Sequence, residues 1–522
     1  MSDTSMYFYS LGKIKNITLG KKDITLSEFI AVVRYNAGVY LSEDYISRVK
    51  SSRKLLEKLI EEKRIIYGVT TGFGYNCDKI IDKEDAEKLQ KNILISHACS
   101  VGEALKPEAV RGILLMMLLN LGQGYSGIKV ETVEFLCELL NKRVTPFAPA
   151  HGSVGYLSPE AHIALIITGR GKAWYRGNLV DADEALKRAD IKAPKLSYKE
   201  GLALISGTTS ITAISAIAVY DSMKSAINLD IAGAMSLEVL KGTIHAFDPR
   251  LQSVRRHDNQ RNTADNINRI LKDSEISSKY INYRLQDALS LRCMPQLHGA
   301  AKKTLKDAYT TILDEMNSCC DNPIIYPVNS TDGEALMGGN ADGSYVGIEA
   351  DSMGIADVNL GKMSERRLQR LLNENESGMP AFLVQKPGLN SGLMVTQYSA
   401  AGILGEMRIL ASPATIDNVS TCANQEDYVS MGYNAAKKAL RISQLLENII
   451  SMEIIASSQA VKFLHPLKQS PVTSKICSKI RNIMPEMYED IFIYPYIEKI
   501  RKMIHSGTLI KYVEEEIGSL KF

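Results

Sequence analysis

The sequence lacks a long apolar run and an excess of charge of either sign. Its most apolar stretches, such as residues 113–121 and 163–168, are far shorter than the ~18 residues that a membrane helix needs. The formal net charge is only +3, from 62 basic and 59 acidic residues, so no strong field is available to attract nucleic acid. We therefore expect neither a membrane partner nor a nucleic-acid partner.

The sequence also has few of the patterns that indicate a metal-binding or cofactor-binding site. Its eight cysteines are scattered without a Cys-x-x-Cys pair, which is typical of a reducing compartment and predicts a cytoplasmic protein. Its eight histidines show no i, i+4 pairing of the kind that binds metals, and the glycines of residues 68–74 lack the spacing of a dinucleotide fingerprint. These patterns predict neither a metal site nor a bound cofactor.

Two segments lack helix breakers over unusual lengths and predict long helices. Residues 435–465 contain neither proline nor glycine, and residues 207–233 have no break between the two terminal glycines. In the first segment Ile442, Leu445 and Ile449 recur at helical spacing. Such a helix would be roughly 45 Å long and could be buried only by neighbours of similar length. We therefore predict a mainly α fold with a long-helix central bundle, and shorter helices over 364–373, 392–410 and 496–505.

Two long segments are rich in proline, glycine, asparagine and serine and predict ordered loops, at residues 143–155 and 321–343. Long loops within a compact protein are usually functional. We expect a loop-rich N-terminal domain over residues 1–205, which carries the active-site loops, and a bundle domain over residues 206–522.

Several polar residues stand in glycine-rich or otherwise unusual surroundings. Taken singly, each has an ordinary explanation: Tyr67 suits a core tyrosine, Arg292 a structural ion pair, and Glu426 a helix cap. Their surroundings, however, form a series of blocks in a fixed order. The blocks include YGVTTGFG (67–74), NILISHACSVGEAL (92–105), GSVG (152–155), EGLALISGT (200–208), QDALSLRCMPQLHGA (286–300), DNPI (321–324), MGGN (337–340) and TCANQEDYVSMG (421–432).

Through these blocks the chain resembles the aromatic amino acid ammonia-lyase superfamily, and the histidine ammonia-lyase branch in particular. The resemblance implies a histidine ammonia-lyase/fumarase-like bundle, a homotetramer with active sites shared between subunits, and a small-molecule substrate. It implies that Tyr67 removes the β-proton, that Arg292 holds the substrate carboxylate and that Glu426 faces the ring. It also implies that His97 and Gln286 line the substrate pocket. The substrate-binding set that we expect is His97, Tyr156, Ser206, Gln286, Arg292, Asn322 and Asn340.

The chain departs from the family after its GSVG block. There the family has Ala-Ser-Gly, which cyclises to an electrophilic methylidene-imidazolone, followed by an aspartate. In this chain Gly155 is followed directly by Tyr156-Leu-Ser-Pro-Glu. Ser206 and Leu289 also replace the family's asparagine and tyrosine. The resemblance therefore implies a branch that works without the prosthetic group and has no cofactor.

A substrate with a quaternary nitrogen loses a neutral amine and has less need of an electrophile. On this ground we expect a carbon–nitrogen lyase like that of the ergothionase branch, which releases trimethylamine from ergothioneine or a related histidine betaine. Lys386 would then stabilise charge on the ring sulfur as a third catalytic residue, and Tyr156 would offer its ring to the trimethylammonium group. Two alternatives stay open, namely an ammonia-lyase or aminomutase acting on histidine or another aromatic amino acid, and an inactive scaffold homologue.

Overall fold

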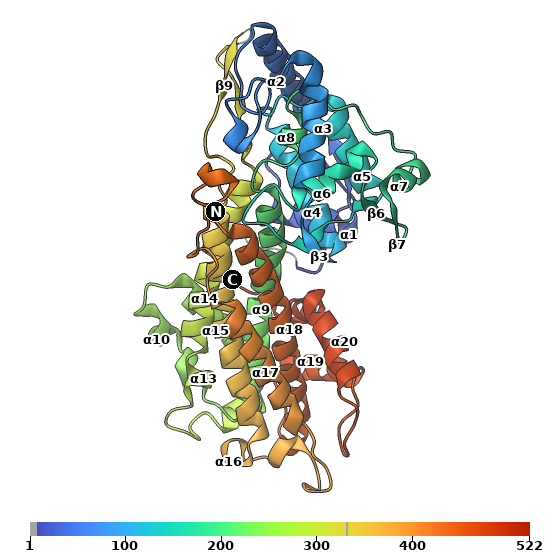
Figure 1. Cartoon of the computed structure of the whole chain (residues 1–522). Helices are drawn as coiled ribbons and strands as arrows, with labels where there is room; N and C mark the ends of the chain where they lie inside the picture. Colours follow the sequence, from blue (N-terminus) through green and yellow to red (C-terminus); the bar gives the residue numbers. More distant parts are fainter. Residues whose placement is uncertain (1–7, 330–331) are drawn as a thin grey trace.

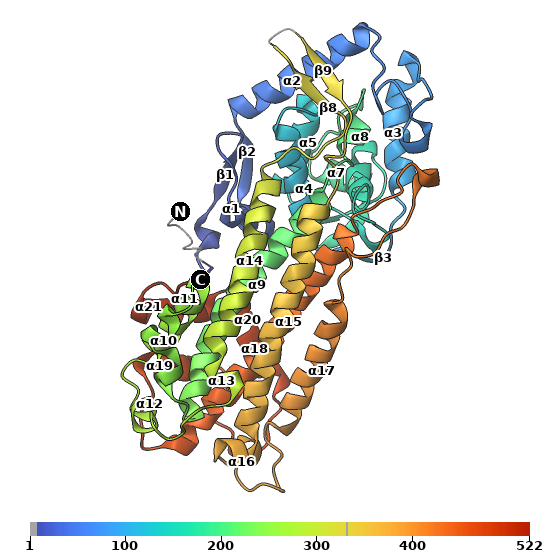
Figure 2. The ribbon, with the colours of Figure 1, turned by 90° about the vertical axis from the view of Figure 1, so that its left-hand side faces the viewer.

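The computed structural model describes residues 8–329 and 332–522, which form a rod of long helices with a cap of shorter elements at one end (Figure 1). Five helices make up the rod: α9 (Thr209–Val239), α14 (Met294–Met316), α15 (Ser344–Leu372), α17 (Met394–Leu410) and α18 (Gly432–Ala460). Helices α9, α15 and α18 begin at the capped end, whereas α14 and α17 run in the opposite direction (Figure 2). The capped end of the bundle therefore carries the N-termini of three helices and the opposite end those of two.

The cap is formed mainly by the first 205 residues. Its helices are α1 (Leu26–Tyr35), α2 (Glu43–Glu61), α3 (Ala86–His97), α4 (Pro107–Gly122), α5 (Val130–Asn141), α6 (Glu160–Ala164), α7 (Ala182–Arg188) and α8 (Glu200–Ala203). Its strands are β1 (Asn16–Leu19), β2 (Gly38–Leu41), β3 (Val101–Ala104), β4 (Thr145–Pro146), β5 (Pro149–His151), β6 (Lys172–Tyr175) and β7 (Asn178–Asp181), joined by a hairpin of β8 (Ile324–Pro327) and β9 (Gly333–Leu336). Strand pairs are β1 with β2 (parallel) and β3 with β5 (antiparallel), and β4-β6-β7 form an antiparallel sheet.

Short helices flank the far half of the rod. They are α10 (Pro249–Ser253), α11 (Asp258–Ile270), α12 (Glu275–Lys279), α13 (Leu289–Arg292), α16 (Glu374–Ser377), α19 (Pro471–Arg481), α20 (Tyr494–His505) and α21 (Thr508–Ile517). Single 3-10 turns lie at Leu11–Lys13, Gly74–Asn76, Lys83–Asp85, Leu165–Thr168, Ile244–Phe247, Ala381–Leu383, Cys422–Asn424 and Val461–Leu464.

The predicted mainly helical bundle is confirmed, and α9 is its axis. All 31 residues of α9 are buried, because α4, α14, α15 and α18 surround it. In the described ranges no helix combines the length and apolar character needed to cross a membrane.

Helix α15 is much longer than the helix predicted over residues 364–373, because glycines mask its pattern. Gly347, Gly354 and Gly361 recur every seven residues and face α18. A Cβ at Gly347 would lie 2.9 Å from the Cα of Gly432, and a Cβ at Gly354 would lie 3.1 Å from Ile442. These glycines therefore permit close helix packing and do not end the helix. The predicted loops also contain short strands, β4 and β5 in one and β8 and β9 in the other.

Charged side chains are buried inside the bundle as hydrogen-bonded groups. The Arg367 guanidinium donates to Glu453 at 2.5 and 3.0 Å, and both side chains are fully buried. Asp230 accepts from Lys302 at 2.5 Å and contacts His298 Nδ1 at 2.9 Å. Each charge has a partner, which makes removal of one member costly.

Replacing Arg367 by methionine is expected to lower the free energy of unfolding by ~3–5 kcal/mol, because the Glu453 carboxylate would stay buried without its cation. Denaturant unfolding of the purified protein measures this loss. Arg441→Met is the matched control, since the Arg441–Glu406 pair is about half exposed and such pairs contribute at most ~1 kcal/mol. Equal losses in the two variants would contradict the assignment.

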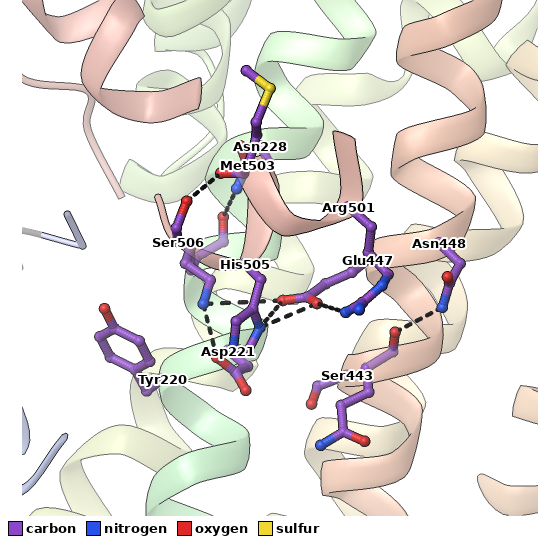
Figure 3. A network of polar contacts seen from close by, with 12 residues as sticks. Tyr220, Asp221, Asn228, Ser443, Glu447, Asn448, Arg501, Met503, His505 and Ser506 are labelled. Atoms are coloured by element: carbon purple, nitrogen blue, oxygen red, sulfur yellow. Dashed lines mark hydrogen bonds and ion pairs between the residues drawn. The ribbon is translucent and has the colours of Figure 1, made fainter. Parts of the chain in front are cut away.

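A second buried network joins α20 to the bundle (Figure 3). Glu447 of α18 contacts His505 Nδ1 at 2.9 Å and Arg501 at 3.4 Å, while Asp221 of α9 accepts from Lys224 at 2.8 Å. Asp221, Glu447 and His505 are close enough together to hold a metal ion. Their carboxylates are already paired with Lys224, Arg501 and Arg34, so the arrangement is that of an ion network.

Asp357, on α15, gives the stability a pH dependence. Burial, with Asp221 nearby, raises the pKa of Asp357 to about 7, against 3.8 for an ordinary aspartate. Between these values the folded protein keeps a proton that the unfolded chain releases, so stability falls as the pH rises from about 4 to 7. Asp357→Asn should therefore melt higher than the parent protein at pH 8, with little difference at pH 4. An equal difference at both pH values would show that this carboxyl group does not titrate as described.

Candidate active site

Three long helices begin next to one another at the capped end of the rod. The loops before α15 and α18 meet α9 there: a Cβ at Gly432 would lie 3.0 Å from Ile211 and 3.1 Å from the carbonyl oxygen of Gly343. Gly155 packs at the same point, against Ser430 and Ile211. Helix N-termini carry partial positive charge, so this end of the bundle favours anionic groups.

Tyr67 lies in the glycine-rich turn beside this convergence. It is half-buried, and its hydroxyl oxygen accepts a hydrogen bond from the Gly74 N–H at 2.9 Å. Burial raises the pKa of Tyr67; the Gly74 N–H opposes this, and Glu426 adds to it. A base that works near neutral pH needs a lowered pKa, whereas burial in the single chain raises that of Tyr67.

Glu426 interacts with three other predicted residues, Tyr67, His97 and Tyr156. The Tyr156 hydroxyl donates a hydrogen bond to Glu426 Oε2, and burial together with this carboxylate raises the pKa of Tyr156 well above its usual value. Burial lowers the pKa of His97, at the end of α3, and the charge of Glu426 opposes this shift. Tyr67, His97, Tyr156 and Glu426 are therefore brought together from four separate segments.

Three further predicted residues, Ser206, Asn322 and Asn340, also lie at the capped end. The buried Ser206 hydroxyl accepts from the Asn322 N–H at 3.1 Å, and Asn322 Oδ1 accepts from the Gly338 N–H at 3.0 Å. Asn322 and Asn340 line a cavity of about 380 Å³. These residues can present amide groups to a ligand at the capped end.

The remaining predicted residues lie at the opposite end of the bundle. Arg292 Nε donates to the Asp287 carbonyl oxygen at 2.9 Å, and Asp287 binds the Thr243 N–H just beyond the end of α9. Gln286 is exposed in the same region. Lys386 is also exposed, three residues after Leu383, whose carbonyl oxygen accepts from Gln459 near the end of α18.

A single chain therefore does not bring the predicted carboxylate holder to the predicted base. Ser206 precedes α9 and Arg292 lies beyond its end, and 31 helical residues span roughly 45 Å. The structure separates the predicted residues into a base end with Tyr67 and Glu426 and a carboxylate end with Arg292.

Two residues at the base end were not predicted. Glu160 is fully buried and accepts from the Ser210 N–H at 2.8 Å and from the Thr209 hydroxyl at 3.0 Å, so it caps α9. Its place between Pro159 and an apolar helix was the available sequence signal. The Cys422 thiol accepts from the Tyr75 N–H at 3.3 Å, next to Gly74, and no sequence pattern indicated this contact.

The residues present do not fit the family's prosthetic group. The tripeptide Ala-Ser-Gly occurs nowhere in the sequence, and Gly155 is followed by Tyr156. A Cβ at Gly155 would lie 2.6 Å from Ser430 Oγ, and the Tyr156 side chain reaches Glu426 directly.

Comparisons with known proteins agree with this fold. Residues 24–482 match the family described as aromatic amino acid lyase. The chain is 43% identical to histidine ammonia-lyase 1 of Fusobacterium nucleatum, over 98% of this chain and 99% of that protein. The solved histidine ammonia-lyase of Trypanosoma cruzi is 34% identical, covers 96% of each chain and has a TM-score of 0.89. The ergothionase of Treponema denticola is 26% identical, covers 95% of this chain and 99% of that one, and has a TM-score of 0.87.

The expectation of an ergothioneine-cleaving enzyme is therefore wrong. Relatives that are 39 to 43% identical over nearly the full length are named histidine ammonia-lyases, whereas the ergothionase is more distant. The inference failed because it deduced the leaving group from a missing electrophile alone. The sulfur role of Lys386 and the trimethylammonium contact of Tyr156 depended on that substrate and are withdrawn with it. The chain belongs to the aromatic amino acid lyase family and is a mainly helical carbon–nitrogen lyase.

Proposed function

We propose that this protein eliminates ammonia from histidine or a closely related aromatic amino acid. The observation that carries the proposal is the grouping of Tyr67, His97 and Glu426 around one point in a chain whose full-length relatives are named histidine ammonia-lyases. Elimination requires a base at the β-carbon, a holder for the carboxylate and a contact for the ring. The chain has a residue suited to each task.

In this proposal Tyr67 takes the proton from the β-carbon as a phenolate. The Gly74 N–H stabilises the phenolate oxygen, since a hydrogen bond to the charged form favours it. Arg292 binds the carboxylate through its guanidinium, and Glu426 faces the ring. Gln286, Asn322, Asn340, Ser206 and His97 complete the wall around the substrate.

The proposal requires a second copy of the chain, because Tyr67 and Arg292 lie at opposite ends of the bundle. Antiparallel packing of two bundles would place the base end of one copy beside the carboxylate end of the other. Exposed apolar residues on α15 and α17, among them Tyr345, Ile348 and Tyr398, support such packing. We propose a homotetramer with shared sites, in which residues 1–205 and 206–522 act as the two domains.

We further propose that the reaction proceeds without a methylidene-imidazolone and without a bound cofactor. The direct Gly155–Tyr156 sequence supports this, as does the contact of Tyr156 with Glu426. The eight free cysteines support a cytoplasmic location.

The test is incubation of the purified assembly with histidine, phenylalanine and tyrosine separately, measuring ammonia and the ultraviolet absorbance of the conjugated acid. Histidine should yield ammonia and urocanate in equal amounts. Conversion of an α- to a β-amino acid without ammonia would favour the aminomutase alternative. No turnover of any of the three would favour the inactive scaffold.

A further inference from the structure

Tyr156 stands where the family has its electrophile-bearing loop, yet its hydroxyl is directed to the carboxylate that faces the substrate ring. In the family the methylidene-imidazolone is an electrophile of the protein that activates the substrate. In this chain the corresponding position is connected to Glu426 by a hydrogen bond.

Removal of the β-proton requires an acceptor for the electron pair that it leaves behind. Removing it beside a neutral imidazole leaves an electron pair with no good acceptor. Beside an imidazolium, the same pair enters the ring and cancels its positive charge. A ring that binds in its protonated form thus provides its own electron sink.

We propose that the Tyr156–Glu426 pair binds the imidazolium form of the substrate, so that the charge of the ring replaces the missing electrophile. This inference rests on the proposed function and deepens it, because it limits the substrate to a protonatable ring. Phenylalanine and tyrosine rings cannot accept a proton on a ring nitrogen.

The contacts of Glu426 suit this task. The Tyr156 hydroxyl donates a hydrogen bond to Glu426 Oε2. Within the described part of the chain Glu426 Oε1 has no hydrogen-bond partner, so this oxygen is available to a ring N–H of the substrate. Burial and the neighbouring carboxylate raise the pKa of Tyr156, so its hydroxyl stays a hydrogen-bond donor that positions Glu426. The other titratable groups that interact with this pair are Tyr67, His97 and Cys422.

The reaction balances with these groups alone. The Tyr67 phenolate takes the β-proton, and the C–H electron pair enters the imidazolium to give a neutral alkylidene ring. The pair then returns to form the Cα–Cβ double bond, while the ammonium group leaves as neutral ammonia with the C–N electrons. The ring is again an imidazolium, and no oxidant or reductant is consumed. Pairing of Glu426 with the ring also removes one cause of the raised pKa of Tyr67.

The test is titration of urocanate bound to the full assembly, because its absorption band differs between the protonated and neutral ring. In the parent protein the ring pKa of bound urocanate should rise by at least one unit, which is a ~10-fold preference for the imidazolium. Glu426→Gln should abolish this rise. Tyr156→Phe should keep the rise but lower kcat for histidine ~10-fold or more, because the carboxylate keeps its charge and loses its position.

Tyr433→Phe is the matched control. Tyr433 is a buried tyrosine whose hydroxyl donates to the Ala150 carbonyl oxygen at 3.2 Å, beside the same loop, and its loss should change neither readout. If bound urocanate titrates as it does in water, or does not bind, the inference is overturned whether or not histidine is a substrate. Turnover of phenylalanine at the histidine rate also overturns it. A raised ring pKa without turnover would show that the pair binds the imidazolium, and would overturn the proposed function and with it the activating role of the ring charge.

Discussion

Replacing Tyr67 by phenylalanine is expected to lower kcat for histidine by ~10²–10⁴-fold, the usual contribution of a positioned general base. The ring of phenylalanine keeps the half-buried packing of Tyr67, so only the hydroxyl and its hydrogen bond from the Gly74 N–H are lost. The folded assembly should form as before. Steady-state kinetics and size-exclusion chromatography measure the two properties.

The pH dependence adds a second readout to the same experiment. Burial raises the pKa of Tyr67, so its phenolate fraction increases toward alkaline pH while the imidazolium fraction of histidine falls. In the parent protein kcat/KM should therefore rise at acid pH, stay level between the pKa of the ring and that of Tyr67, and fall at higher pH. Tyr75→Phe is the control, because Tyr75 lies in the same turn with its side chain largely exposed. A Tyr67→Phe variant within threefold of the parent rate would place the base elsewhere.

The bundle could be predicted from sequence where a helix has no breakers. Residues 435–465 predicted α18, and the observed helix covers Gly432–Ala460 before a 3-10 turn. The same rule missed most of α15, because a glycine that allows two helices to approach looks the same in sequence as one that ends a helix. Gly347 and Gly354 act in the first way, and the residues of the partner helix that show this, Gly432 and Ile442, lie 85 and 88 residues further along the chain.

The site could be predicted only as a set of residues. Ordered blocks identified Tyr67, Glu426 and Arg292 together, but sequence order carries no information about which end of a 31-residue helix each one occupies. The contact between Tyr156 and Glu426 was likewise invisible, since 270 residues separate them. The expected substrate failed for a related reason: a missing electrophile does not by itself identify the leaving group.

The separation of Tyr67 from Arg292 leads to the second large expected effect. Arg292→Met should lower kcat/KM for histidine by ~10²-fold or more, since it removes a charged, bidentate contact to the carboxylate. Each of the variants Tyr67→Phe and Arg292→Met should thus be nearly inactive alone. Co-expression of the two should restore activity, because a shared site can take Tyr67 from one copy and Arg292 from another.

The amount restored tests the geometry directly. When the two variants mix at random, about one site in four combines an intact base end with an intact carboxylate end, so the mixed assembly should recover up to about a quarter of the parent activity. Co-expression of Tyr67→Phe with Glu426→Gln is the matched control. Both residues lie at the base end of the same chain, so every site in that mixture keeps one defect and activity should stay low. Recovery in the control, or none in the test pair, would mean that the two ends of the bundle do not meet in one active site.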